Sequence, residues 1–264
     1  MAETHLQDRN FNGLIQHFNR RIYQTSKGRI RLALLMRDLE EILPSLFSPQ
    51  APLNILDAGA GEGMLALKLA QAGHKVTLCD YSSQMLDSAR QSAQQLGLDD
   101  RVQFVEGRIQ ECFGHDSQFD LVLCHAVLEW VGEPRALVQQ LVQLTKPNGL
   151  ISLMFFNHHS TVFRSLVRGY LDKALNNHFS GNGEGLTPIN PLMPDQVIGW
   201  LNDADTGILL ESGIRVFHDY MHKDVRDRRS ESDILQLEMR YSRIDPYRAM
   251  GRYYHVVGRS PAIK

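Results

Sequence analysis

The spacing of apolar residues changes once along the chain. In the N-terminal part, "GRIRLALLMRDLEEIL" (28–43) repeats apolar residues at the 3.6-residue period of a helix that lies on a core. Residues 9–26 are also predicted to be helical, and the prolines after residue 43 mark a linker. From Leu53 onward, short apolar runs typical of buried strands alternate with amphipathic helical segments. Short links between such segments predict parallel strand–helix–strand units with helices on both faces of a sheet.

The alternation places strands at 53–59, 75–80, 101–107, 149–157, 208–220 and 252–260, and a strand that runs into a helix at 119–130. Helices are predicted at 62–72, 82–96, 134–145, 194–203 and 230–242. The rhythm breaks at about 158–190, which is helical at first and then polar. We therefore predict an α/β fold with one seven-stranded, mostly parallel sheet, in which an N-terminal helical cap (1–50) precedes a domain (51–264) with an inserted lid.

Composition limits the partners and the cellular location that we expect for this domain. The 264 residues are 43% hydrophobic with a net charge of -2, so global charge does not indicate nucleic acid, although a local basic patch can still bind it. The cysteines Cys79, Cys112 and Cys124 lack metal-ligand spacing, which predicts free thiols and no metal. No apolar run reaches the ~18 residues that span a bilayer, and residues 1–12 lack a signal-peptide core. We expect a cytoplasmic protein with no membrane partner.

The segment "LDAGAGEGMLALKLA" (56–70) places three glycines at the junction of the first strand and the next helix. A ligand at the carboxyl end of that strand must come within contact distance of the backbone, and a side chain at Gly59 or Gly61 would block it. A tight turn that only packs on its neighbour is the structural alternative. About twenty residues later Asp80 ends the second strand, where an acid accepts hydrogen bonds from two ribose hydroxyls.

The glycine pattern distinguishes between two adenosine ligands. Dinucleotide sites usually read G-x-G-x-x-G and leave the helix N-terminus free for a pyrophosphate. Here the pattern is D-A-G-A-G-E-G, with Asp57 before the first glycine and Glu62 after the second. Carboxylates there would repel phosphates and suit the cationic sulfonium of S-adenosylmethionine. The pattern resembles the first motif of the class I S-adenosylmethionine-dependent methyltransferases, whose antiparallel edge the last two predicted strands also resemble.

Two further strand ends belong to the same rim. "EGRIQE" (106–111) follows the third strand, where an adenine could receive backbone hydrogen bonds near Arg108 and Ile109. His125 ends the fourth strand and could contact the methionyl part of the ligand, although a lone histidine is often structural.

A more specific resemblance covers nearly the whole chain. The segments "LCHAVLEWV", "SLMFFN", "GIRVFHDY", "QDRNFN", "IYQTSKGRIR" and "LQLEMRYSRIDPYRAMGRYYHV" resemble the tRNA 5-carboxymethoxyuridine methyltransferases from residue 7 to residue 259. This resemblance implies methyl transfer from S-adenosylmethionine to the carboxylate of 5-carboxymethoxyuridine at the tRNA wobble position. Carried over by position, it implies cofactor contacts at Arg31, Gly59, Ala60, Asp80, Ile109 and His125, to which the glycine turn adds Gly61. Ala60 stands where a relative has glycine, and 176–190 matches the family poorly.

The chemistry of this reaction agrees with the residues present. A carboxylate is already ionised at pH 7, so no general base is needed. In-line placement is required instead, and arginine is suited to holding a carboxylate because its fork donates two hydrogen bonds. Arginines and tyrosines interleave in the C-terminal part, as in surfaces that bind single-stranded RNA loops, which would fit the anticodon loop. The candidates are Arg215, Arg240, Arg243, Arg248 and Arg252 with Tyr220, Tyr241, Tyr247, Tyr253 and Tyr254.

From this set we predict that Arg215, Arg252, Tyr241 and Tyr253 position the substrate. An amphipathic helix and edge strand with solvated arginines is the structural alternative for this cluster. "KDVRDRRSES" (223–232) is a candidate phosphate patch or a solvated charge run. Two other functions also remain open at this point. One is a small-molecule carboxyl or hydroxyl methyltransferase, and the other is a non-catalytic protein that binds S-adenosylmethionine or RNA.

Overall fold

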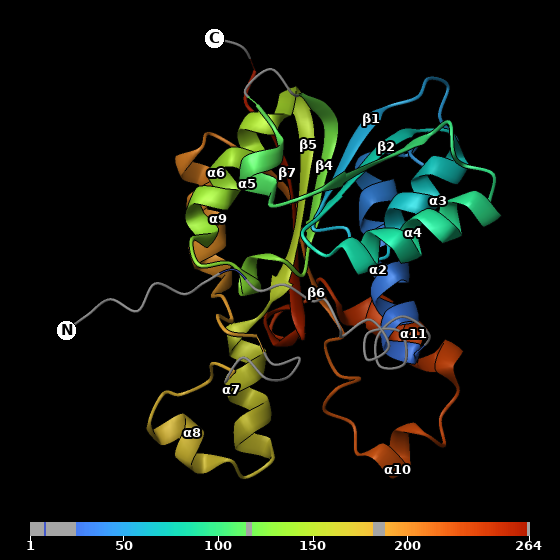
Figure 1. Ribbon diagram of the computed structural model, residues 1–264. Coiled ribbons are helices and arrows are strands. Elements are labelled where there is room, and N and C mark those ends of the chain that lie inside the picture. The colour runs from blue at the N-terminus through green and yellow to red at the C-terminus, as the bar shows by residue number, and fades with distance from the viewer. Residues whose placement is uncertain (1–7, 9–24, 115–117, 182–187, 263–264) are drawn as a thin grey trace.

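The computed structural model describes residues 8, 25–114, 118–181 and 188–262. Its centre is a seven-stranded sheet in the order β3-β2-β1-β4-β5-β7-β6 (Figure 1). The strands are β1 (Asn54–Ala58), β2 (Lys75–Asp80), β3 (Val102–Glu106), β4 (Phe119–His125), β5 (Thr145–Phe156), β6 (Gly207–Ile214) and β7 (Tyr253–Arg259). Strands β1 to β5 pair in parallel, and β7 is antiparallel to both β5 and β6. The predicted mostly parallel sheet with an antiparallel C-terminal edge is confirmed.

Helices cover both faces of the sheet. The helices, with labels as in Figure 1, are α2 (Ser26–Ile42), α3 (Met64–Ala72), α4 (Ser83–Gln95), α5 (Ile109–Cys112), α6 (Pro134–Leu144), α7 (His158–Val167), α8 (Leu171–Leu175), α9 (Pro194–Asp203), α10 (Lys223–Arg226) and α11 (Glu231–Tyr241). Buried residues of α2, α3, α4 and α11 share one core cluster, and those of α5, α6 and α9 share another. Local signals fix several helix starts: Ser82 caps α4 by accepting the N–H of Met85, and Pro134 and Pro194 begin α6 and α9.

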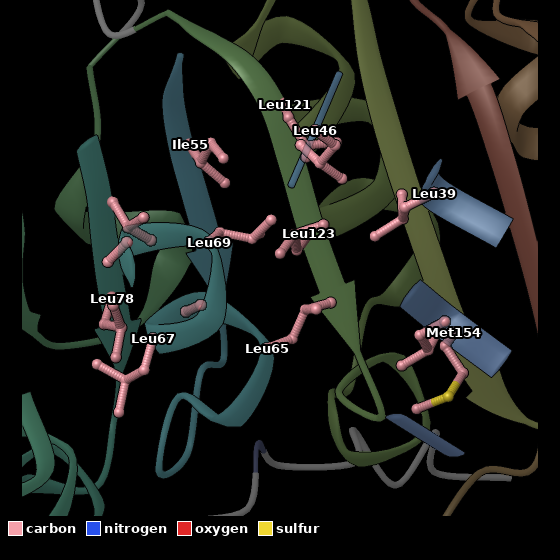
Figure 2. Close-up of a cluster of buried hydrophobic side chains, with 14 of the residues drawn as sticks. Leu39, Leu46, Ile55, Leu65, Leu67, Leu69, Leu78, Leu121, Leu123 and Met154 are labelled. Carbon is pink, nitrogen blue, oxygen red and sulfur yellow. The ribbon is translucent and has the colours of Figure 1, made fainter. Parts of the chain in front are cut away.

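The described part of the predicted N-terminal cap packs directly on the sheet. Figure 2 shows Leu39 of α2 and Leu46 beside Leu121 and Leu123 of β4, and all four belong to the same buried cluster. Apolar burial of this kind contributes ~25 cal/mol per Å² removed from water. Helix α2 is thus held over the strands that carry the predicted site.

Four predicted segments differ from the structure or lie outside its description. The strand predicted at 208–220 ends at Ile214, because Arg215 adopts a left-handed φ of 62° that a strand cannot continue. The helix predicted after β4 is a short 3₁₀ turn, Leu128–Trp130. Residues 9–24 of the predicted first helix lie outside the described residues, as do 182–187 of the polar loop. Figure 1 shows α7 and α8 extending beyond the sheet on one side and α10 on the other, and a lid role for the insertion stays a prediction.

Candidate functional site

A pocket lies at the carboxyl ends of the parallel strands, where open α/β sheets bind their ligands. Its wall is built from the segments that follow β1, β2, β3 and β4, together with the first turns of α2 and part of β5. Every residue predicted to contact the cofactor lines it: Arg31, Gly59, Ala60, Gly61, Asp80, Ile109 and His125. Residues far apart in the sequence are therefore gathered around one cavity, and their binding role is a prediction taken up below.

The turn between β1 and α3 requires its glycines. Gly59 and Gly61 have φ values of 78° and 56°, in the left-handed region that other residues rarely adopt. A Cβ atom added to Gly59 would lie 2.3 Å from Cγ2 of Val127, which also lines the pocket. The N–H groups of Gly59 and Ala60 both donate to the carbonyl oxygen of Cys79, at 2.8 and 3.0 Å. The turn is thereby fastened to β2 with bare backbone facing the cavity.

The effect of this close approach on the free energy of unfolding can be measured by comparison with a second glycine that has a similar φ but no close neighbour. Gly97 has a similar φ of 66° but nothing within 4 Å of an added Cβ atom. Gly97→Ala is expected to cost about 1–2 kcal/mol of unfolding free energy from left-handed strain alone. Gly59→Ala is expected to cost about 1–3 kcal/mol more, because the methyl group overpacks Val127. Urea unfolding followed by circular dichroism measures both; equal costs for the two variants would contradict the clash.

Asp80 is arranged to accept hydrogen bonds from a neutral diol. Its Oδ2 accepts the N–H of Gly61 at 2.7 Å and its Oδ1 accepts the N–H of Ser82 at 2.8 Å. The carboxylate also accepts the backbone N–H of Tyr81, and its remaining acceptor capacity is available to a ligand hydroxyl. Burial raises the pKa of Asp80, while the N–H groups of Ser82 and Gly61 oppose that rise by stabilising the anion.

Asp57 gives the pocket a second acidic group. Burial, together with the nearby Asp80, raises the pKa of Asp57 to about 7. A pocket that holds two buried carboxyl groups repels phosphates and favours a cationic ligand. Among the described residues no group of three or more His, Cys, Asp and Glu side chains is arranged to hold a metal ion. The acid pair therefore fits a cationic organic ligand.

Several pocket residues escaped the sequence reasoning. They are Asp8, Gly28, Leu32, Leu35, Met64, Leu65, Tyr81, Met85, Gly107, Gln110, Ala126, Val127, Trp130, Val131 and Met154. Asp8 accepts the N–H of Gly132 at 2.9 Å, which brings this residue of the N-terminal stretch to the pocket. Tyr81 could have been found because it directly follows Asp80 at the end of β2. The apolar members carried no signal, because their spacing is that of ordinary core residues.

Next to the pocket lies a group of cations, Lys27, Arg164, Arg215 and Arg252, which we call the cation cluster. Its carboxylate is Asp219, whose Oδ2 lies 3.0 Å from Nε of Arg215 and whose Oδ1 lies 3.6 Å from Nζ of Lys27. Burial acts to raise the pKa of Asp219, but Arg215, His218 and Arg252 outweigh it and hold that pKa far below its usual range. The cluster meets the pocket wall in two places, because Lys27 precedes Gly28 of α2 and Arg252 packs on Phe156, two residues after Met154 of β5; Gly28 and Met154 both line the pocket.

Two members of the cation cluster have no anion of their own. In the described part of the chain, neither Arg164 nor Arg252 has a carboxylate within ion-pair distance, and Nε of Arg164 is buried without a hydrogen-bond partner. The guanidinium carbon of Arg252 lies 4.1 Å from the ring centre of Phe156. Burial, helped by nearby Arg164 and Arg215 and opposed by the attraction of Asp219, lowers the pKa of Arg252 to about 10. The cluster is short of negative charge and suited to an anionic ligand.

The structure separates the predicted substrate residues. Arg215, Arg252 and Tyr253 lie together: the Arg215 guanidinium carbon is 5.3 Å from the Tyr253 ring centre, and the Arg252 N–H donates to the Arg215 carbonyl oxygen. Tyr241 instead ends α11, where its ring meets Tyr247 with centres 4.9 Å apart.

Other C-terminal candidates already have partners. Arg243 donates to Asp38 and Glu41, and Arg248 donates to Asp245. Tyr220 donates to the Met250 carbonyl oxygen at 2.8 Å, and Tyr254 donates to Glu211 at 2.6 Å. These side chains support the fold locally, so the structure favours Arg252 over Arg243 and Arg248 as an anion ligand.

No helix in the described ranges is long and apolar enough to cross a membrane.

Residues 56–153 match the family model described as a methyltransferase domain. A tRNA 5-carboxymethoxyuridine methyltransferase from Escherichia coli is 42% identical over 260 residues, which cover 98% of this chain and 99% of the relative. A ubiquinone biosynthesis O-methyltransferase from Klebsiella pneumoniae is 32% identical over 57% of this chain and 60% of the relative.

A solved structure shows the same fold. Magnesium protoporphyrin IX methyltransferase from Synechocystis, crystallised with bound SAH, aligns with a TM-score of 0.60 at 19% identity over 94% of this chain and 95% of that chain. At this identity the likeness is one of fold.

Proposed function

The chain belongs to the tRNA 5-carboxymethoxyuridine methyltransferase family, and we propose that it transfers the methyl group of S-adenosylmethionine to the carboxylate of 5-carboxymethoxyuridine in tRNA, giving the methyl ester. The observation that carries the proposal is the pairing of an acidic pocket with an adjoining cation cluster. The acidic pocket fits a cationic donor, and the cation cluster fits an anionic acceptor. A single reaction that uses both is methyl transfer from a sulfonium to a carboxylate.

The pocket fits S-adenosylmethionine by the chemistry of its donor set. Asp80 would accept both ribose hydroxyls, and backbone near Ile109 would face the adenine. The bare backbone at Gly59, Ala60 and Gly61 leaves room for the methionyl part. When bound, the cofactor supplies an electrophilic methyl group on a positively charged sulfur. Arg31 and His125 complete the proposed set of binding residues.

The cation cluster would hold the substrate carboxylate. Arg252 is the proposed principal ligand, because its guanidinium has no carboxylate partner among the described residues and its fork matches a carboxylate. Arg215 and Tyr253 would shape the same wall, and Arg164, which the sequence reasoning missed, adds a second unpaired guanidinium. Tyr241, the last residue of α11, stays a proposed substrate residue outside the cation cluster.

The reaction needs no proton transfer from the protein. Bound S-adenosylmethionine would supply the methyl group, with its sulfur keeping the electron pair of the broken bond, and Arg252 would hold the substrate carboxylate oxygen that would take the methyl group. Because the nucleophile is ionised at neutral pH, the residues need only align it and exclude water. Alignment alone can contribute about 7–11 kcal/mol to lowering the barrier.

We propose that the surface formed by α7, α8 and the segment around α10 receives the anticodon loop of the tRNA. Figure 1 shows α7 and α8 extending beyond the sheet. Exposed aromatic side chains of α7 and of the turn before α8, Phe163 and Tyr170, stand close in sequence to Arg168 and Lys173. Interleaved aromatic and basic side chains of this kind stack bases and pair phosphates of single-stranded RNA. The basic segment 223–232 around α10 would contribute phosphate contacts on the other side.

The direct test is nucleoside mass spectrometry of tRNA that carries 5-carboxymethoxyuridine, after incubation with the purified protein and S-adenosylmethionine. A gain of one methyl group on that nucleoside is the expected result. An unchanged nucleoside, with S-adenosylmethionine still bound by the protein, would contradict the tRNA substrate. The search would then move to small carboxylic acids.

Unmodified tRNA is expected to be inert. Without the carboxymethoxy group, the wobble uridine offers neither the nucleophile nor the anion that fits the cation cluster. Transfer of a radiolabelled methyl group from S-adenosylmethionine to matched tRNAs with and without the carboxymethoxy group measures the difference in rate. Comparable rates on both would rule out the carboxylate as the acceptor.

A further inference from the structure

A line of buried polar side chains crosses the sheet from the pocket to helix α2. His125 Nε2 lies 2.8 Å from Oγ of Ser152, and that oxygen lies 2.9 Å from Nε2 of His255. His255 Nδ1 in turn lies 2.8 Å from Oδ2 of Asp38. We call these four residues of β4, β5, β7 and α2 the polar relay. Ser152, His255 and Asp38 are fully buried, so the relay costs desolvation that an apolar core would avoid.

The inner end of the polar relay is an ionised carboxylate. Asp38 accepts hydrogen bonds from Arg37, from Arg243 at 2.7 Å and from Ser212. Burial acts to raise the pKa of Asp38, but His255, Arg37 and Ser212 together hold it well below its usual range. Asp38 is therefore an acceptor only, and Nδ1 of His255 must carry the proton between them.

A second proton on His255 would have no carboxylate of its own to face. Asp38 already faces the guanidinium groups of Arg37 and Arg243, so its charge is balanced. A third positive charge on a fully buried ring would add desolvation and repulsion without a further carboxylate to face it. With the proton on Nδ1, Nε2 of His255 is an acceptor.

The hydrogen-bond directions then follow along the relay. The Ser152 hydroxyl donates to His255 Nε2, so its oxygen accepts from His125. His125 therefore carries its proton on Nε2 and a lone pair on Nδ1. Burial lowers the pKa of His125 well below its usual value, so the ring stays neutral. Nδ1 has no hydrogen-bond partner within the described part of the chain, and His125 lines the pocket.

We propose that Asp38, acting through His255 and Ser152, is a positioning residue that fixes His125 as the Nε2–H tautomer, so that Nδ1 accepts a hydrogen bond from an N–H donor on the methionyl part of S-adenosylmethionine. The identity of the ligand rests on the proposed function. The tautomer rests on the relay geometry and on a single proton on His255, which the proposal includes. The arrangement uses the logic by which a buried aspartate orients a catalytic histidine.

The tautomer is measured directly by ¹H–¹⁵N spectra of the full chain carrying ¹⁵N-labelled histidine, with the His125 signals assigned by comparison with His125→Gln. Protonated Nε2 and unprotonated Nδ1 are expected in the wild-type protein. A proton on Nδ1 instead would overturn the proposal without the use of any relay variant.

Two serines provide a matched pair for the binding measurement. Ser152 and Ser212 are both fully buried in strands of the same sheet and both bond to the polar relay, but only Ser152 connects the two histidines. Ser152→Ala is expected to release the His125 tautomer and weaken S-adenosylmethionine binding about three- to tenfold by calorimetry, the loss typical of one hydrogen bond. Ser212→Ala is expected to leave the tautomer and the affinity unchanged. Equal losses from both would overturn the proposal.

Asp38→Asn gives the complementary result. The new amide can donate to His255 Nδ1, which reverses each hydrogen bond in turn and leaves a proton on His125 Nδ1 facing the ligand. Weaker binding than in Ser152→Ala, together with the opposite tautomer, is expected in protein shown to be folded by near-ultraviolet circular dichroism. An unreversed tautomer would overturn the relay. If the wild-type protein shows the expected tautomer yet does not bind S-adenosylmethionine, the proposed function fails while the relay stands.

Discussion

Asp80→Ala is expected to weaken S-adenosylmethionine binding about 100-fold or more. The side chain keeps acceptor capacity for ribose hydroxyls beside the backbone N–H groups that it accepts, and each such bond to a charged group contributes about 1.5–3 kcal/mol. The change also removes the acceptor of the Gly61 N–H, so the glycine turn loses one of its fastenings to β2. Both effects reduce affinity in the same direction. Isothermal titration calorimetry with S-adenosylmethionine measures the loss.

Asp99→Ala is the control for the Asp80 variant. Asp99 is exposed in the turn before β3 and is not among the pocket-lining residues, so its removal is expected to leave binding unchanged. Asp80→Asn adds a finer test, because it keeps the shape but replaces one acceptor oxygen with a donor. Binding of the alanine variant within a few-fold of the wild type would show that Asp80 does not hold the ribose.

Arg252→Met is expected to lower kcat/KM for tRNA carrying 5-carboxymethoxyuridine about 100- to 1000-fold. The reason is the loss of two charge-assisted hydrogen bonds to the substrate carboxylate, each contributing about 1.5–3 kcal/mol. Affinity for S-adenosylmethionine is expected to stay unchanged, because Arg252 does not line the pocket. Arg252→Lys keeps the charge without the fork and is expected to fall between the wild type and the methionine variant.

The stability of the Arg252 variant separates a binding role from a structural one. Since the cost of burying the Arg252 charge, added to the repulsion of Arg164 and Arg215, outweighs the attraction of Asp219, its removal is expected to leave Tm unchanged or raise it. Arg259→Met, at the far end of β7 from Arg252, is the control for both activity and stability. A large drop in Tm with little loss of activity would show that Arg252 holds the fold and not the substrate.

The cofactor pocket was largely predictable because its signals are local. Gly59, Gly61 and Asp80 stand at the ends of two strands that are recognisable from their apolar runs, and parallel strands end at the same edge of the sheet. The family resemblance added Arg31, which no spacing rule connects to that edge. Packing of α2 on the sheet brings it there.

The cation cluster was only partly predictable. Arg215, Arg252 and Tyr253 were found because they come from neighbouring parts of the C-terminal sequence. Arg164 of α7 and Lys27 of α2 come from distant segments, and in sequence each reads as an ordinary solvated charge. Which arginines lack a carboxylate partner cannot be read from spacing, since pairing depends on side chains that the fold brings together.

Sequence patterns were enough to predict the succession of strands and helices, the glycine turn and the acid that follows it, because these depend on backbone conformation and on periods of two or 3.6 residues. Tertiary structure alone decided where β6 ends, which guanidinium groups remain unpaired, and how Asp38, His125, Ser152 and His255 join across the sheet. The last of these joins a residue of α2 to one of β7 that is 217 positions away in the chain. Burial and hydrogen-bond partnership across such separations depend on packing, and packing is set by all the elements at once.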